Sequence, residues 1–222
     1  MIEPGQRVLA TGITGSGKSR LLGYYFATFP GQRLLVDVND DYELGRLALE
    51  EGASNVRGDP GRLDWSKRTL RYVPDRLDQD EYEEVYTVVW EQARAGQEMF
   101  VWLDECLGPT TESQSPRHLR LALGQGRKKN LTHAGASLRP VGIEKMLRNQ
   151  SEHFFAFESA DEDDIAAIAR RFNVSPAELR TALATLPKYG SLYHRLGQPG
   201  ITAFPPLDPA RLKLTGRHIR MP

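Results

Sequence analysis

Short apolar runs, separated by polar, glycine- and proline-rich stretches, recur along most of the chain. Each run has the length and composition of a strand that is buried on both faces in a parallel sheet. The predicted strands cover residues 7–11, 33–38, 69–73, 99–105, 131–138 and 152–157. Helical spacing of apolar positions predicts helices over 18–29, around 44–52 and over 78–95, whereas 53–68 is predicted to be a loop. Alternating strands and helices predict an α/β domain with a mainly parallel central sheet flanked by helices.

The C-terminal third has a different pattern. Residues 161–187 predict two short helices, the second starting with a capping box of Ser175 and Glu178. Their spacing matches a DNA-binding helix-turn-helix. The second helix offers only Arg180 as an exposed base, however, which favours a structural pair at the edge of the main sheet.

A hairpin is predicted over residues 189–204, and a basic, proline-rich stretch follows it. We therefore expect a single domain over 1–204, with the helical pair on its edge. Residues 205–222 are expected to form an extended C-terminal arm.

Composition places the chain among ordinary globular proteins. It has 222 residues, of which 26% are charged and 40% hydrophobic, and its 29 basic and 29 acidic side chains give no net charge. Global charge therefore gives no sign of a nucleic-acid partner, although local patches still can. The single cysteine, Cys106, excludes an intramolecular disulfide and fits a reducing compartment. We expect a protein without a membrane span, because no apolar run is long enough to cross a bilayer.

A glycine-rich motif follows the first predicted strand. Residues 12–19 match the phosphate-loop pattern G-x-x-x-x-G-K-[ST], between a strand and a helix as the motif requires. The glycines let backbone N–H groups point at a phosphate, Lys18 reaches the β- and γ-phosphates, and the Ser19 hydroxyl can bind Mg²⁺. The predicted nucleotide-binding residues are Gly12, Thr14, Gly15, Ser16, Gly17, Lys18, Ser19 and Arg20.

Two carboxylates end the apolar strand over residues 99–105. Asp104 has the place of the aspartate that holds Mg²⁺ in phosphate-loop NTPases, and Glu105 can accept a proton from an attacking water. Asp37 also ends a strand, but the polar residues that follow it favour a turn or helix-capping role.

Positive charge is locally concentrated over residues 107–150. The bases are Arg117, Arg120, Arg127, Lys128, Lys129, Arg139, Lys145 and Arg148. They form either an ordinary solvated surface or a face that contacts phosphates, of DNA or of a neighbouring subunit's nucleotide.

The order of these motifs resembles the FtsK/HerA superfamily of ring-forming, DNA-pumping ATPases. The residues that carry the resemblance are Thr11–Ser19, Leu103–Glu105, Gly126–Asn130 and the pair Arg139-Pro140. More narrowly, the chain resembles the genome-packaging ATPases of tailless double-stranded DNA viruses with an internal membrane. It is similarly short, Arg71–Pro74 precede the long acidic helix, and Leu186–Gly190 is similar to the C-terminal segment of that family.

The resemblance implies a RecA-like P-loop NTPase fold of the additional-strand catalytic-Glu type. It further implies MgATP hydrolysis at the interfaces of a pentameric or hexameric ring, with Lys18 and Glu105 catalytic and Ser19 and Asp104 holding Mg²⁺. An arginine of the neighbouring subunit would complete the site, with Arg127 as first candidate and Arg120 as second. The family usually has a polar sensor, commonly Gln, before the Arg-Pro pair. Leu138 takes that place here and cannot form such hydrogen bonds, so either Ser137 or another residue takes the sensing role.

The partners implied are double-stranded DNA, bound without sequence preference, and capsid-vertex or membrane-associated viral proteins. The implied location is the host cytoplasm and the packaging vertex of the virion. Two alternatives remain open: a cellular or plasmid DNA translocase of the same superfamily, and a nucleotide-dependent regulator that reads DNA through residues 161–187. A small-molecule kinase would need a lid and an acceptor site, and the sequence identifies neither.

Overall fold

The computed structural model describes residues 2–94, 96–108, 110–111 and 114–207. Within these residues the chain forms one nine-stranded sheet in the order β3-β4-β2-β5-β6-β1-β7-β8-β9. The strands are β1 (Arg7–Thr11), β2 (Gln32–Val36), β3 (Ser54–Arg57), β4 (Thr69–Val73), β5 (Met99–Leu103), β6 (Leu131–Ser137), β7 (His153–Ala156), β8 (Ser191–Arg195) and β9 (Thr202–Phe204). Strands β1 to β7 pair in parallel, and the hairpin β8–β9 adds to β7 in antiparallel fashion.

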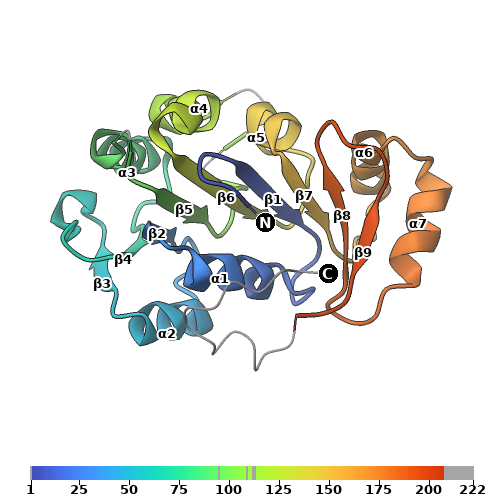
Figure 1. The fold of residues 1–222 in the computed structure, drawn as a ribbon, viewed down its shortest axis with the longest axis horizontal. Coiled ribbons are helices and arrows are strands. Elements are labelled where there is room, and N and C mark those ends of the chain that lie inside the picture. The colour runs from blue at the N-terminus through green and yellow to red at the C-terminus, as the bar shows by residue number, and fades with distance from the viewer. Residues whose placement is uncertain (1, 95, 109, 112–113, 208–222) are drawn as a thin grey trace.

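Helices cover both faces of the sheet (Figure 1). They are α1 (Lys18–Thr28), α2 (Tyr42–Glu50), α3 (Gln79–Gln92), α4 (Arg117–Gln125), α5 (Lys145–Gln150), α6 (Glu162–Phe172) and α7 (Pro176–Ala184). The helices α1 and α2 pack on one face around Phe26, Phe100 and Trp102. The other face packs on α3, α4 and α5. This architecture confirms the predicted α/β class.

Strand β6 lies between the phosphate-loop strand β1 and the acid-pair strand β5. One inserted strand at this place is the feature that the additional-strand fold type predicts. Because parallel strands all end at the same edge of a sheet, the segments that follow β1, β2, β5 and β6 are brought together there.

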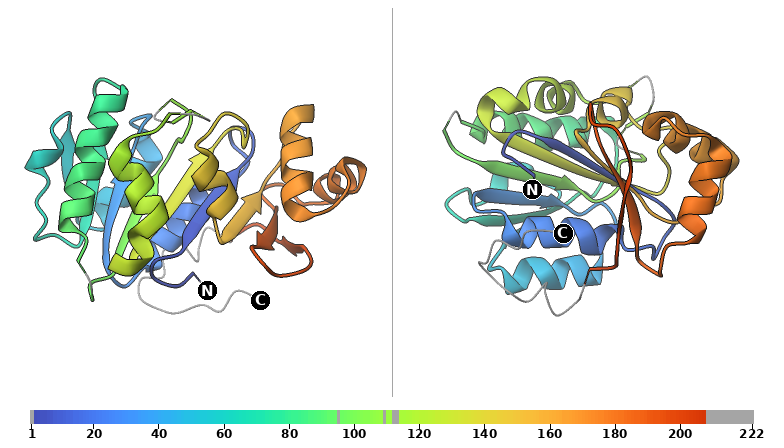
Figure 2. Two further views of the ribbon diagram at one scale, coloured as in Figure 1. Left: turned by 90° about the horizontal axis from the view of Figure 1, so that it is seen from above. Right: turned by 45° about the vertical axis from the view of Figure 1, so that its right-hand side comes forward.

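The helical pair α6–α7 and the hairpin are present and lie beside the edge of the parallel sheet (Figure 2). The capping box is also present, since Ser175 Oγ accepts from Glu178 N while the Glu178 carboxylate accepts from Ser175 N. Of the expected C-terminal arm, residues 208–222 lie outside the described residues.

The prediction of a loop over residues 53–68 was wrong. Strand β3 and a 3-10 turn over Pro60–Arg62 lie there. The strand is a partly exposed edge strand of alternating burial, so it lacks the apolar run that marks the inner strands. The sequence also did not predict α4 and α5, which are short, and α4 has Pro116 at its N-cap, without the usual capping side chain.

Two buried histidines predict an acid-sensitive core. Burial lowers the pKa of His133 to about 3 from its ordinary 6.5, and lowers that of His153 to about 4. At pH values between these lowered pKa values and 6.5, the unfolded chain binds more protons than the folded one. The free energy of unfolding therefore falls as the pH falls below about 6.5.

The His133→Gln variant isolates one of these protons, because a glutamine amide can still bond to the Tyr86 hydroxyl, which lies 2.8 Å from His133 Nε2. Near pH 5, we expect the free energy of unfolding of the variant to depend less steeply on pH. Its slope should be smaller than that of the wild type by roughly 1.4 kcal/mol per pH unit. The measurement is urea unfolding at several pH values. Equal slopes for the two proteins would contradict a neutral buried His133.

Candidate active site

The phosphate loop joins β1 to α1. Gly17 is the N-cap of α1, with a φ of 113°, and it has no side chain that could occupy the free N–H groups of the helix start. Gly12 has a φ of 147°, and a Cβ there would lie 2.7 Å from Phe157 Cβ and 2.9 Å from Glu158 O. The segment that follows β7 approaches Gly12 so closely that only glycine fits at this position. The helix start therefore stays open to an anion.

Lys18 is buried at the end of the phosphate loop. Its Nζ donates to Gly12 O at 2.7 Å and to Ile13 O at 2.9 Å. Burial lowers the pKa of Lys18, and the charges of Glu105 and Asp104 oppose that shift. The two hydrogen bonds thus hold the ammonium against the backbone of the loop.

Asp104 follows β5 at the same edge of the sheet and is 8% exposed. Its Oδ1 is buried and has no hydrogen-bond partner among the described residues. Burial, reinforced by the charge of Asp37, raises the pKa of Asp104 to about 7. A buried carboxylate oxygen without a partner is the group that a divalent cation would satisfy. With the exposed hydroxyl-bearing Ser19 on the loop, these residues fit the expected Mg²⁺.

Glu105 lies between Lys18 and the end of β6. Burial raises its pKa, whereas the backbone N–H groups of Leu107 and Leu138, the charge of Lys18 and the Ser137 hydroxyl oppose the shift. The Leu107 N–H donates to Glu105 Oε1 at 2.9 Å. A partly desolvated carboxylate in this place has a raised proton affinity, as a general base requires.

The structure places Ser137 beside Glu105. Its hydroxyl is buried and donates to Arg139 O at 2.7 Å. Leu138, at the place where the resemblance predicts a polar sensor, is 40% exposed. The sensing role of Ser137 stays a prediction.

Two charged contacts at this edge were not predicted. Asp37 is fully buried and accepts from Arg71 at 2.6 and 2.9 Å, as well as from the Asp41 N–H in the turn. Asp37 thus has the expected contact within the turn and, in addition, an ion pair with Arg71. Its charge also acts on Asp104. Arg139 pairs with Asp164 at 3.0 Å, which connects the end of β6 to α6.

The two arginines that are candidates for completing the site of a neighbouring subunit are Arg127 and Arg120. Arg127 is exposed in the 3-10 turn Gly126–Lys129, which precedes β6 and hence lies at the amino edge of the sheet, opposite the phosphate loop. Arg120 is exposed on α4. Arg20, by contrast, is near the loop, with its guanidinium 5.2 Å from the centre of the Tyr189 ring.

Solved structures with the same architecture were found by structural comparison. The genome packaging NTPase B204 from Sulfolobus turreted icosahedral virus 2, in complex with AMPPCP, matches with a TM-score of 0.74 at 18% identity, over 92% of this chain and 98% of B204. The chain has the fold of the FtsK/HerA-like P-loop ATPases. The pCW3 conjugation coupling protein TcpA matches with a TM-score of 0.62 at 15% identity, over 90% of this chain and 59% of TcpA. The Thermomonospora curvata type VII secretion ATPase EccC matches with a TM-score of 0.60 at 16% identity, over 93% of this chain and 24% of the EccC chain.

No family model and no curated protein matches the chain. Among the residues that the structure describes, no helix is long and apolar enough to cross a membrane. The same residues contain no cluster of three or more histidine, cysteine or acidic side chains placed to hold a metal ion.

Proposed function

We propose that the protein is an ATP-hydrolysing motor that moves double-stranded DNA. The observation that carries the proposal is the meeting of Lys18, Asp104 and Glu105 at one edge of the sheet, beside an open helix start. Such a site binds a triphosphate, holds a metal and offers a base for water.

The proposed chemistry assigns a separate task to each residue. The backbone N–H groups over Gly15–Ser19 and the Lys18 ammonium hold the phosphates. Glu105 orients the attacking water and takes its proton. Ser19 and Asp104 would hold Mg²⁺, which neutralises phosphate charge when bound. An arginine from a neighbouring subunit would stabilise the charge that develops on the transferred phosphoryl group.

We further propose that the DNA is a viral genome, packaged into a preformed capsid by a pentameric or hexameric ring of this chain. Support for packaging comes from the likeness to B204, a genome packaging NTPase, which has a TM-score of 0.74, against 0.62 for TcpA and 0.60 for EccC. Capsid-vertex or membrane-associated proteins would be the further partners, in the host cytoplasm and the virion.

The helix-turn-helix alternative is disfavoured by the surroundings of α7. Arg180 is its exposed base, and that guanidinium forms an ion pair with Glu162 of α6. A regulator of this kind would need bases free to reach a DNA groove.

The test is ATP hydrolysis with and without double-stranded DNA of two unrelated sequences. We expect both to stimulate hydrolysis equally and high salt to remove the stimulation, because sequence-independent contacts to phosphates release counterions. Stimulation by one sequence only would favour the regulator, and a rate indifferent to DNA would contradict the motor.

A further inference from the structure

The turn Pro187–Gly190 contains a strained aromatic residue. The Gly190 N–H donates to Pro187 O at 2.8 Å, and Tyr189, the third residue of the turn, has a φ of 68°. Turns of this kind usually place glycine or asparagine there. A bulky ring in the left-handed region is rare and costs free energy, and such strain tends to be found at ligand sites.

Tyr189 lies against the phosphate loop. A Cβ on Gly17 would be 3.3 Å from Tyr189 Cβ. The Arg20 guanidinium, one residue beyond the end of the loop motif, lies 5.2 Å from the ring centre, and Lys188 Nζ lies 5.0 Å from it. The Tyr189 ring is therefore half-buried, with two cations near it, at the point where α1 begins.

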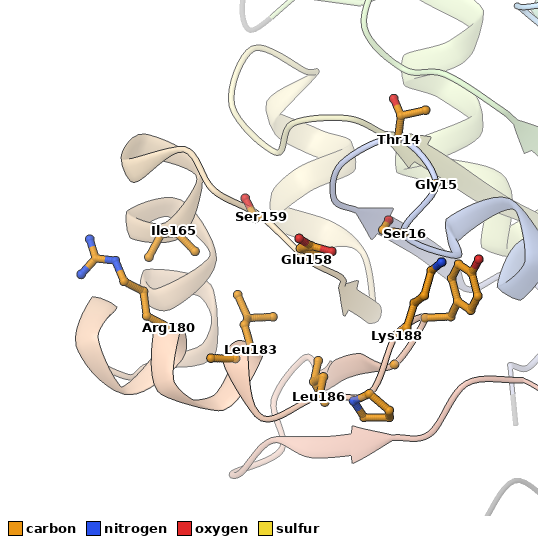
Figure 3. Close-up of a pocket in the computed structure, with 14 residues that line it drawn as sticks. Thr14, Gly15, Ser16, Glu158, Ser159, Ile165, Arg180, Leu183, Leu186 and Lys188 are labelled. Carbon is orange, nitrogen blue, oxygen red and sulfur yellow. The ribbon is translucent and has the colours of Figure 1, made fainter.

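A cavity of about 610 Å³ is lined by residues of the loop, of this turn and of α7. Figure 3 shows Thr14 and Ser16 on one side of it and Leu183 and Leu186 on another, with Glu158 between them. Tyr189 also contributes to the lining. The walls of the cavity therefore combine apolar side chains with polar groups. Such a mixed lining, in a cavity of this size, suits a ligand with an aromatic ring and hydroxyl groups.

We propose that this cavity receives the base and ribose of the nucleotide whose phosphates the loop holds, and that the base stacks on Tyr189. The inference rests on the proposed function, since it takes residues 12–19 as the triphosphate site. Stacking uses the face of a base, so Tyr189 adds affinity for the nucleoside without reading its edges. The strain of the turn is then the cost of keeping the ring in place beside the loop.

The test compares two probes, ATP-γ-S and inorganic triphosphate, by titration calorimetry with Mg²⁺. The variant Tyr189→Asn removes the ring and suits the left-handed backbone better than most residues, so the turn is retained. Tyr189→Phe keeps the ring, and Tyr42→Asn, at a tyrosine that is 79% exposed on α2, is the matched control.

We expect Tyr189→Asn to weaken ATP-γ-S binding by about 10- to 100-fold and to leave the affinity for inorganic triphosphate unchanged. Tyr189→Phe and Tyr42→Asn should bind both probes as the wild type does. Unchanged ATP-γ-S binding in Tyr189→Asn, or an equal loss for both probes, would overturn the stacking role alone. A wild-type protein that binds neither probe would overturn the proposed function as well, so the two failures are distinguishable.

Discussion

Glu105→Gln is expected to bind ATP with at least wild-type affinity and to hydrolyse it about 100- to 10,000-fold more slowly. Glutamine has nearly the same shape but cannot take a proton from water. It also removes a negative charge from the neighbourhood of Lys18, whose ammonium Glu105 now helps to keep protonated. Binding should therefore survive while the chemical step fails.

The measurement is phosphate release in a single turnover, together with the Kd of a fluorescent ATP analogue. Glu50→Gln is the matched control, because Glu50 is an exposed carboxylate at the end of α2, away from the loop. It should hydrolyse ATP at the wild-type rate. A wild-type rate in Glu105→Gln itself would show that another group activates the water.

Arg127→Ala is expected to lower hydrolysis by about 1,000- to 100,000-fold, the usual effect of losing an arginine that acts on the transferred phosphoryl group. The structure indicates in which subunit Arg127 could act. Arg127 lies at the amino edge of the sheet and the phosphate loop at the carboxyl edge, so the residue cannot reach the site of its own subunit. Any role in hydrolysis must be in a neighbouring subunit.

Mixing variants tests this shared site. Subunits with Arg127→Ala keep an intact loop, and subunits with Lys18→Ala keep an intact arginine. In randomly mixed rings, about one quarter of the interfaces pair an intact loop with an intact arginine. The mixture should therefore recover about one quarter of the wild-type activity, although each variant alone is inactive. Arg120→Ala is examined in the same way as the second candidate, and Arg46→Ala, at an exposed arginine on α2, should have no effect. Mixtures without any recovery would exclude Arg127 as the trans residue.

The sequence predicted the central part of the fold because its signals are local. Each inner parallel strand is an uninterrupted apolar run, and the glycines and lysine of the loop are adjacent in the chain. The carboxylates at 104 and 105 follow directly from the end of such a run. Since parallel strands share one carboxyl edge, the meeting of Lys18 with both acids could be expected before the structure was known.

What the sequence could not predict depends on distant contacts. The pairing of Asp37 with Arg71 joins residues 34 positions apart, and that of Arg139 with Asp164 joins residues 25 apart. Neither has a local pattern. Strand β3 was missed because an edge strand needs little apolar surface, and the strained turn at Tyr189 has the sequence of an ordinary proline–glycine turn.

If ATP hydrolysis at this site moves the chain along DNA, the protein should displace a labelled third strand from a DNA triplex. We expect the wild-type protein to remove the third strand in the presence of ATP and Mg²⁺, for any flanking duplex sequence. Neither the wild type with ATP-γ-S nor Glu105→Gln with ATP should do so. Rapid DNA-stimulated hydrolysis that leaves the third strand in place would contradict movement along DNA.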